Sequence, residues 1–182
     1  MASKALKTVV VESVTDLSNM DDLTAVVRVR SNSCNDAGIT TLDLSPYSSL
    51  QELTIGSSCF ANVVTLNVTG LQELRKVEIG ENSFTKRKNS FGYDPNRHFY
   101  LKNCNNIKEL RIGQYSFSDY SEFAISNNPS IEVIEMGDLN IQHDSFNFYY
   151  ASLELKSLPK LKSVLFGKES FRECNRVVFE SD

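Results

Sequence analysis

One short phrase recurs along this chain of 182 residues. Five copies are recognisable: LQELTIGSSCF at 50–60, LRKVEIGENSF at 74–84, IKELRIGQYSF at 107–117, IEVIEMGDLNI at 131–141 and LKSVLFGKESF at 161–171. Where the spacing is regular, as between Gly56 and Gly80, neighbouring copies lie 24 residues apart. A repeat of about 20 to 50 residues predicts similar units that stack and bury a shared core.

Apolar and polar residues alternate over only a few positions inside each copy, as in LTI at 53–55 and LRI at 110–112. This period is typical of a short strand with one buried face. A second apolar pair precedes each copy: Leu42 and Leu44, Leu66 and Val68, Phe99 and Leu101, Phe123 and Ile125, and Leu153 and Leu155, with Val177 and Phe179 opening a sixth unit. The sequence therefore predicts a mostly β solenoid of right-handed coils of about 24 residues, each with two short parallel strands.

Two further positions recur in every copy. Glycine follows the second strand at Gly56, Gly80, Gly113, Gly137 and Gly167. This indicates a turn that needs a positive φ or leaves no room for a Cβ. Four residues later come Phe60, Phe84, Phe117, Ile141 and Phe171. These are expected to stack as a spine that closes each coil, with Ile141 replacing phenylalanine once.

The repeated phrase resembles a leucine-rich repeat. Its IGxxSF element, together with FRECNRV at 171–177, resembles the IGxxAFxxCxxL phrase of the BspA-like leucine-rich repeats of bacteria and unicellular eukaryotes. The resemblance covers about residues 24–182 and implies an adhesion or scaffolding role.

We interpret residues 1–182 as one repeat domain. Residues 1–23 form an N-terminal cap, with a strand at 8–14 and a loop or helical turn at 18–23. Residues 24–49 form a degenerate first unit and an entry strand, with Val27, Val29 and Cys34 at strand and spine positions and Arg30 in place of glycine. Residues 50–171 hold the five units, and 172–182 form a terminal strand that either caps the column or belongs to a longer array.

The composition of the chain argues against nucleic-acid-binding, membrane-bound and disulfide-rich classes of protein. The net charge of −4 does not favour nucleic acid or an anionic membrane as a partner. No signal peptide or membrane-spanning run is expected, which favours an intracellular location. The four scattered cysteines, Cys34, Cys59, Cys104 and Cys174, are expected to be reduced rather than to form a disulfide framework.

Catalytic and metal-binding patterns are not recognisable in the sequence. His98 and His143 are its two histidines, and neither has a cysteine, histidine or carboxylate nearby at metal-ligand spacing. Hydrolase, zinc-protease and phosphate-loop motifs do not occur. We therefore expect a protein that is not an enzyme and needs no cofactor or metal.

Charges alternate in sign on the face of the predicted strands that points to solvent. Two lateral rows are expected: Glu52, Lys76 and Glu109, and Glu78, Arg111 and Glu135. They form either a solvated face with weak ion pairs or a charged binding surface. Towards the C-terminus the same face turns apolar at Val133, Leu165 and Val178, which offers a contact for another protomer or a further repeat.

The period is interrupted twice, near 85–98 and near 142–150. Phe99 follows Phe84 by 15 residues and Leu153 follows Ile141 by 12, whereas Phe123 follows Phe117 by six. Both insertions are expected on one edge of the solenoid, roughly 10 Å apart. Candidate ligand-binding residues in the insertions are Lys86, Arg87, Lys88, Phe91, Tyr93, Arg97, His143, Phe146, Phe148 and Tyr149, and on the coil between them Tyr115 and Tyr120.

The leading functional hypothesis is a non-catalytic scaffold that binds a protein partner through the sheet face or the insertions. A self-assembling module whose C-terminal end stacks on another copy is one alternative. Carbohydrate or nucleic-acid binding by the basic and aromatic insertions is another. The alternative for these aromatic residues is that they fold back onto the column as a local core.

Overall fold

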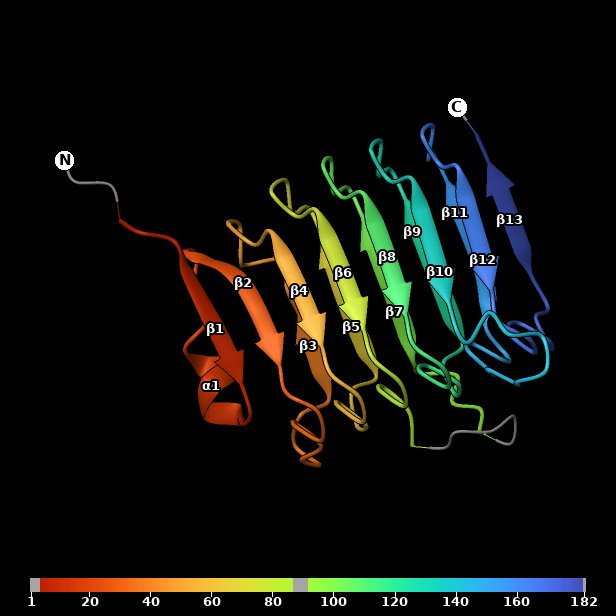
Figure 1. Cartoon of the computed structure of the whole chain (residues 1–182), viewed down its shortest axis with the longest axis horizontal. Helices are drawn as coiled ribbons and strands as arrows, with labels where there is room; N and C mark the ends of the chain where they lie inside the picture. The colour runs from red at the N-terminus through yellow and green to blue at the C-terminus, as the bar shows by residue number, and fades with distance from the viewer. Residues whose placement is uncertain (1–3, 87–91, 182) are drawn as a thin grey trace.

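The computed structural model describes residues 4–86 and 92–181. Its strands form two parallel sheets, between which the chain alternates (Figure 1). In order, the seven-stranded sheet contains β1 (Lys7–Val11), β2 (Thr24–Val29), β4 (Glu52–Ile55), β6 (Lys76–Ile79), β8 (Glu109–Ile112), β10 (Val133–Met136) and β12 (Ser163–Phe166). The six-stranded sheet contains β3 (Thr41–Asp43), β5 (Thr65–Thr69), β7 (His98–Lys102), β9 (Glu122–Ser126), β11 (Ser152–Lys156) and β13 (Val177–Glu180).

Neighbouring strands pair at equivalent positions of the repeat. In the seven-stranded sheet the inward row runs through Leu53, Val77, Leu110, Ile134 and Val164. Strict in-register pairing follows because each strand has one buried face, and a shift by one residue would turn its apolar set to solvent. The prediction of two short parallel strands per unit is confirmed, and this repeat-like arrangement is consistent with a solenoid.

A stack of phenylalanine rings runs along the column between the sheets. Its ring centroids are 5.2 Å apart for Phe60 and Phe84, 4.7 Å for Phe84 and Phe117, 4.9 Å for Phe117 and Phe148, and 5.5 Å for Phe148 and Phe171. The predicted spine is therefore present, but the prediction of Ile141 as its fourth member was wrong. Phe148 fills the place expected for Ile141, which is 83% exposed.

The position of the second insertion explains this error. Phe146 and Phe148 repeat the backbone conformation of Tyr115 and Phe117, with a positive φ at all four residues. The extra residues of this coil therefore lie at 138–144, before the spine phenylalanine, and not at 142–150. The first insertion follows Phe84, and both lie on connections from the seven-stranded to the six-stranded sheet, at the lower edge in Figure 1.

The recurring glycines leave no room for a side chain. A Cβ on Gly113 would lie 2.5 Å from the Gly80 carbonyl carbon, and one on Gly80 would lie 2.8 Å from that of Gly56. Of the five recurring glycines, Gly137 alone has a positive φ, 82°. Close approach of another coil's backbone, rather than a left-handed turn, is thus the reason for glycine at positions 56, 80 and 113, whereas at Gly167 the Ser145 side chain lies nearest.

A buried polar ladder joins neighbouring coils at the residue before Phe84, Phe117 and Phe148. The Ser83 hydroxyl donates to the Gly56 carbonyl at 2.8 Å, and the Ser116 hydroxyl donates to the Gly80 carbonyl at 2.5 Å. Asn147 continues the series by donating from Nδ2 to the Gly113 carbonyl at 2.8 Å. Each bond satisfies a carbonyl that would otherwise be buried without a partner.

The two ends of the column differ. The expected capping strand is present as β1, but the helical turn is α1 (Val14–Ser18), earlier than 18–23, and it lies at the N-terminal end of the column (Figure 1). Leu17 of this helix packs on the core, and Met20 just after it is buried. Within residues 92–181, no helix covers the corresponding end beyond β12 and β13.

Replacing Phe117 by alanine should lower the free energy of unfolding by about 3 to 5 kcal/mol, because the ring is buried between two stacked neighbours. Chemical denaturation followed by circular dichroism measures this loss. Ile141→Ala is the matched control and should have almost no effect, since that residue is exposed. Equal losses for the two variants would contradict the assignment of the stack.

Candidate functional site

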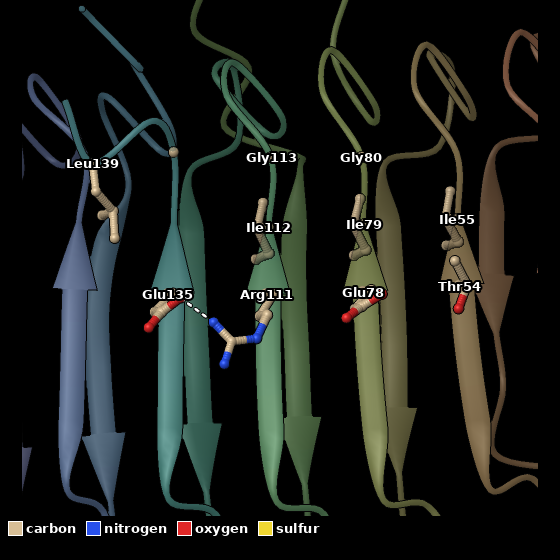
Figure 2. Close-up of a pocket in the computed structure, with 11 residues that line it drawn as sticks. Thr54, Ile55, Glu78, Ile79, Gly80, Arg111, Ile112, Gly113, Glu135 and Leu139 are labelled. Carbon is tan, nitrogen blue, oxygen red and sulfur yellow. Dashed lines mark hydrogen bonds and ion pairs between the residues drawn. The ribbon is translucent and has the colours of Figure 1, made fainter.

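A groove of about 380 Å³ crosses the outer face of the seven-stranded sheet near the ends of its strands (Figure 2). It spans β4, β6, β8 and β10, each of which contributes lining residues. Its charged lining residues are Glu78, Arg111 and Glu135, which point outward from successive strands. The groove therefore runs across the repeat rather than along one strand.

The glycine row forms one margin of this groove. Gly80, Gly113 and Gly137 line it directly after their strands end, so no side chain fills the space at these positions. The loop at 138–144 adds Leu139, whose exposed apolar side chain points to the groove beside Glu135 in Figure 2. An insertion in one coil thus supplies an apolar wall to a surface built by four strands.

The charged residues on this face are lateral neighbours as predicted, and they form ion pairs both between strands and along a strand. Arg111 forms ion pairs with Glu135 on β10 and with Glu109 on its own strand, the latter at 3.2 Å. Lys76 lies 2.8 Å from a Glu78 oxygen and 3.6 Å from a Glu109 oxygen. Its hydrogen bond to Glu78 raises the pKa of Lys76 above the ordinary value. All these groups are partly exposed, so each pair contributes little stability.

Three of the predicted ligand-binding residues are buried, which contradicts a direct contact with a ligand at the surface. Phe148 belongs to the phenylalanine stack. Tyr120 is fully buried and donates its hydroxyl to the Val63 carbonyl at 2.5 Å. Arg97 is only 1% exposed.

Arg97 fixes the first insertion to the column. Its Nη1 donates to Asp119 Oδ1 at 3.1 Å and to the Phe84 carbonyl at 3.3 Å, while Nη2 donates to the Ala61 carbonyl at 2.6 Å. The guanidinium also lies over the Tyr120 ring, 5.5 Å from its centroid. Burial raises the pKa of Asp119, although Arg97 opposes this shift. Arg97 is thus a structural cation rather than part of a ligand site.

A connected row of aromatic rings lies on the insertion edge. Ring centroids are 6.2 Å apart for Tyr115 and Phe146, 5.7 Å for Phe146 and Tyr149, 4.8 Å for Tyr149 and Tyr150, and 5.4 Å for Tyr150 and Tyr93. We call these five residues the aromatic row. Tyr93 is 56% exposed, and the other four are half-buried. The row brings the first insertion into contact with the turn that follows Phe148, through Tyr93 and Tyr150.

The remaining predicted residues have different surroundings. Lys86 is exposed at the start of the first insertion, and its backbone N–H donates to Asp119 at 3.2 Å. His143 is exposed and forms a 2.6 Å hydrogen bond with Asp138 within its own loop. Arg87, Lys88 and Phe91 lie outside the described residues.

Among residues 4–86 and 92–181, no group of three or more His, Cys, Asp or Glu side chains is placed to hold a metal ion. In the same part of the chain, no helix has the length and apolar character that crossing a bilayer requires. Cys34, Cys59 and Cys104 are buried free thiols, and Cys174 is a half-buried one.

Comparison of the chain with known protein families, curated proteins and solved structures finds no match.

Replacing Arg97 by alanine should cost about 3 to 5 kcal/mol of stability, because it leaves the Asp119 carboxylate buried without its cation. The double variant Arg97→Ala/Asp119→Ala should cost less than the sum of the two single losses, as chemical denaturation will measure. Lys86→Ala, an exposed change in the same insertion, is the control and should stay within about 0.5 kcal/mol. Additive losses would mean that the two side chains do not interact.

Proposed function

We propose that this chain is a non-catalytic, protein-binding module of leucine-rich-repeat type, as its resemblance to the BspA-like repeats implies. Its partner binds across the seven-stranded sheet in the groove beside Leu139. The observation that carries this proposal is the groove itself, which combines an apolar wall with charged side chains from several coils.

The dimensions of the groove favour an extended protein segment. Strands in a sheet lie about 4.8 Å apart, so a path across four of them is roughly 14 Å long, the length of about four extended residues. Protein interfaces combine apolar anchors with a polar, hydrated rim. Leu139 supplies an apolar contact, and Glu78, Arg111 and Glu135 supply polar ones.

The charge of this sheet face indicates which kind of protein segment would bind to it. The outward positions of β4, β6, β8 and β10 carry the carboxylates Glu52, Glu78, Glu109 and Glu135, against the cations Lys76 and Arg111. The face therefore has more negative than positive groups. Complementary charge steers association and fixes register. The partner we propose has lysine or arginine beside an apolar residue that packs on Leu139.

The double variant Glu78→Lys/Glu135→Lys tests this function. Peptides selected from a phage-displayed library on the unmodified protein should be rich in basic residues, and the variant should bind them at least about tenfold more weakly. Affinities are measured by fluorescence anisotropy, and the unmodified protein should bind more weakly as salt is added.

Glu154→Lys is the matched control for this experiment. Glu154 lies on the opposite, six-stranded sheet, where it faces Lys156 at 3.6 Å. This variant should keep the affinity of the unmodified protein. Unchanged binding to the groove variant, or equal loss in the control, would contradict a site in the groove.

The aromatic row favours a second candidate function, the stacking of a flat ligand ring. Its rings are in mutual contact and partly exposed, as in platforms on which bases stack. Sugar rings also pack on aromatic side chains of this kind. The ligand of this second function is a glycan or a single-stranded nucleic acid.

Tyr149→Ala/Tyr150→Ala removes the centre of the aromatic row and should weaken such binding at least about tenfold, since each stacked base contributes about 1 to 3 kcal/mol. Titration with an oligothymidylate and with a panel of oligosaccharides measures the effect. Affinity that falls steeply with salt identifies nucleic acid, and salt-independent affinity identifies a glycan. If the unmodified protein binds none of these probes, this second function is excluded.

A further inference from the structure

Both sheets end at the coil formed by β12 and β13. In the preceding coil, the inward residues Leu153 and Leu155 of β11 are buried. The residues of β13 that pair with them, Val177 and Phe179, are 53% and 65% exposed. These two side chains occupy core positions of the repeat, so they require a further layer of the same kind to cover them.

The exposed end also contains a groove between the last strands of the six-stranded sheet and the turn after β11. A space of about 210 Å³ is lined by Leu155, Leu158, Leu161 and Phe179, among others. On the outer face of the same coil, Leu165 of β12 is exposed as well. Apolar side chains at this end are therefore contiguous with the core rather than scattered over a surface.

The free edge of β13 has a defined hydrogen-bonding pattern. The carbonyls of Arg176 and Glu180 accept hydrogen bonds from the Leu153 and Ser157 N–H groups, both at 2.9 Å. Alternation along the strand turns the N–H and C=O groups of Val177 and Phe179 away from β11. An edge with such unpaired groups is a template for another strand.

We propose that this edge pairs with a second copy of the same chain, β13 running antiparallel to β13 around a two-fold axis at Val178. In this register Val177 lies opposite Phe179 of the second copy, so the residues with free backbone groups face each other. Their apolar side chains cover each other at the end of the column. Because β12 belongs to the same coil, its exposed Leu165 approaches the second copy too.

Charge supports this register. Residues 176 and 180 lie symmetrically about Val178, so Arg176 of each copy is opposite Glu180 of the other. Opposite charges on facing strand positions stabilise a pair, and the symmetry forms this contact twice. In the described residues, Arg176 has no ion pair within its own chain, whereas Glu180 lies 3.8 Å from Lys156.

The open end matches itself better than it matches the other end of the chain. At the N-terminal end, Leu17 of α1 packs on the core and Met20 is buried. A head-to-tail stack would therefore place exposed Val177 and Phe179 against an end that is already covered. An isologous dimer instead joins two open ends and pairs the β13 edges of both copies with each other.

Disulfide trapping tests the register. In a Cys174→Ser background, Val178→Cys should form a covalent dimer on mild oxidation, since directly opposite residues that share no hydrogen bonds have Cα atoms about 4.5 Å apart. Glu180→Cys is the matched control, because two copies of residue 180 are too far apart in this register. Equal trapping of both variants, or of neither, would overturn the proposal.

Sedimentation equilibrium of the unmodified chain tests the dimer without oxidation. Arg176→Glu should weaken the dimer about tenfold or more, and Arg176→Glu/Glu180→Arg should restore it. The groove variant Glu78→Lys/Glu135→Lys should dimerise normally. A failure of the proposed dimer can therefore be distinguished from a failure of the proposed protein-binding function. A strict monomer at every concentration, or a dimer unaffected by Arg176→Glu, would refute the proposed pairing.

Discussion

The close contact of neighbouring backbones at the glycine row is the constraint on which the other features depend. A Cβ on Gly113 would lie 2.5 Å from the backbone of Gly80, so only glycine allows the coils to approach this closely. On the inner side, this approach brings the hydroxyls of Ser83 and Ser116 within reach of the glycine carbonyls of the preceding coil. On the outer side, the missing side chains leave the margin of the groove open. One residue type thus determines both the cohesion of the column and the shape of its surface.

Each phenylalanine of the stack has an unfavourable backbone conformation, and the free energy of burying its ring offsets this cost. The φ angles of Phe60, Phe84, Phe117, Phe148 and Phe171 lie between 50° and 62°. A left-handed conformation costs a residue with a Cβ roughly 1 to 2 kcal/mol. Burial of one phenylalanine ring contributes about 1.5 to 3 kcal/mol, before the stacking of rings is counted. Burial of the ring therefore offsets the cost of the turn, and Ile141, which is exposed, contributes no such burial.

The sequence predicted the regular part of the fold well because period and alternation determine which face of each strand is buried. The ion-pair rows around Arg111 follow directly from that register. The irregular part was harder to predict, since the loop at 138–144 displaces the spine residue from its fixed distance to Gly137. The alternation Phe146, Asn147, Phe148 after Ser145, which copies the Tyr115 turn, was the available signal. The burial of Arg97 was not predictable from spacing, because its partner Asp119 belongs to the next coil.

The polar ladder lacks hydrogen bonds near the C-terminal end of the column, and this affects where local unfolding begins. Asn147 Oδ1 and Ser170 Oγ are buried and have no hydrogen-bond partner among the described residues. Asn147 still donates from Nδ2 to the Gly113 carbonyl, so it is the coil of Ser170 that lacks the cross-link of the earlier coils. In a linear array, where each unit is stabilised only by its neighbours, cooperativity is limited by the weakest junction. Local unfolding is then expected to begin at the β12–β13 coil and to leave the remainder of the column intact.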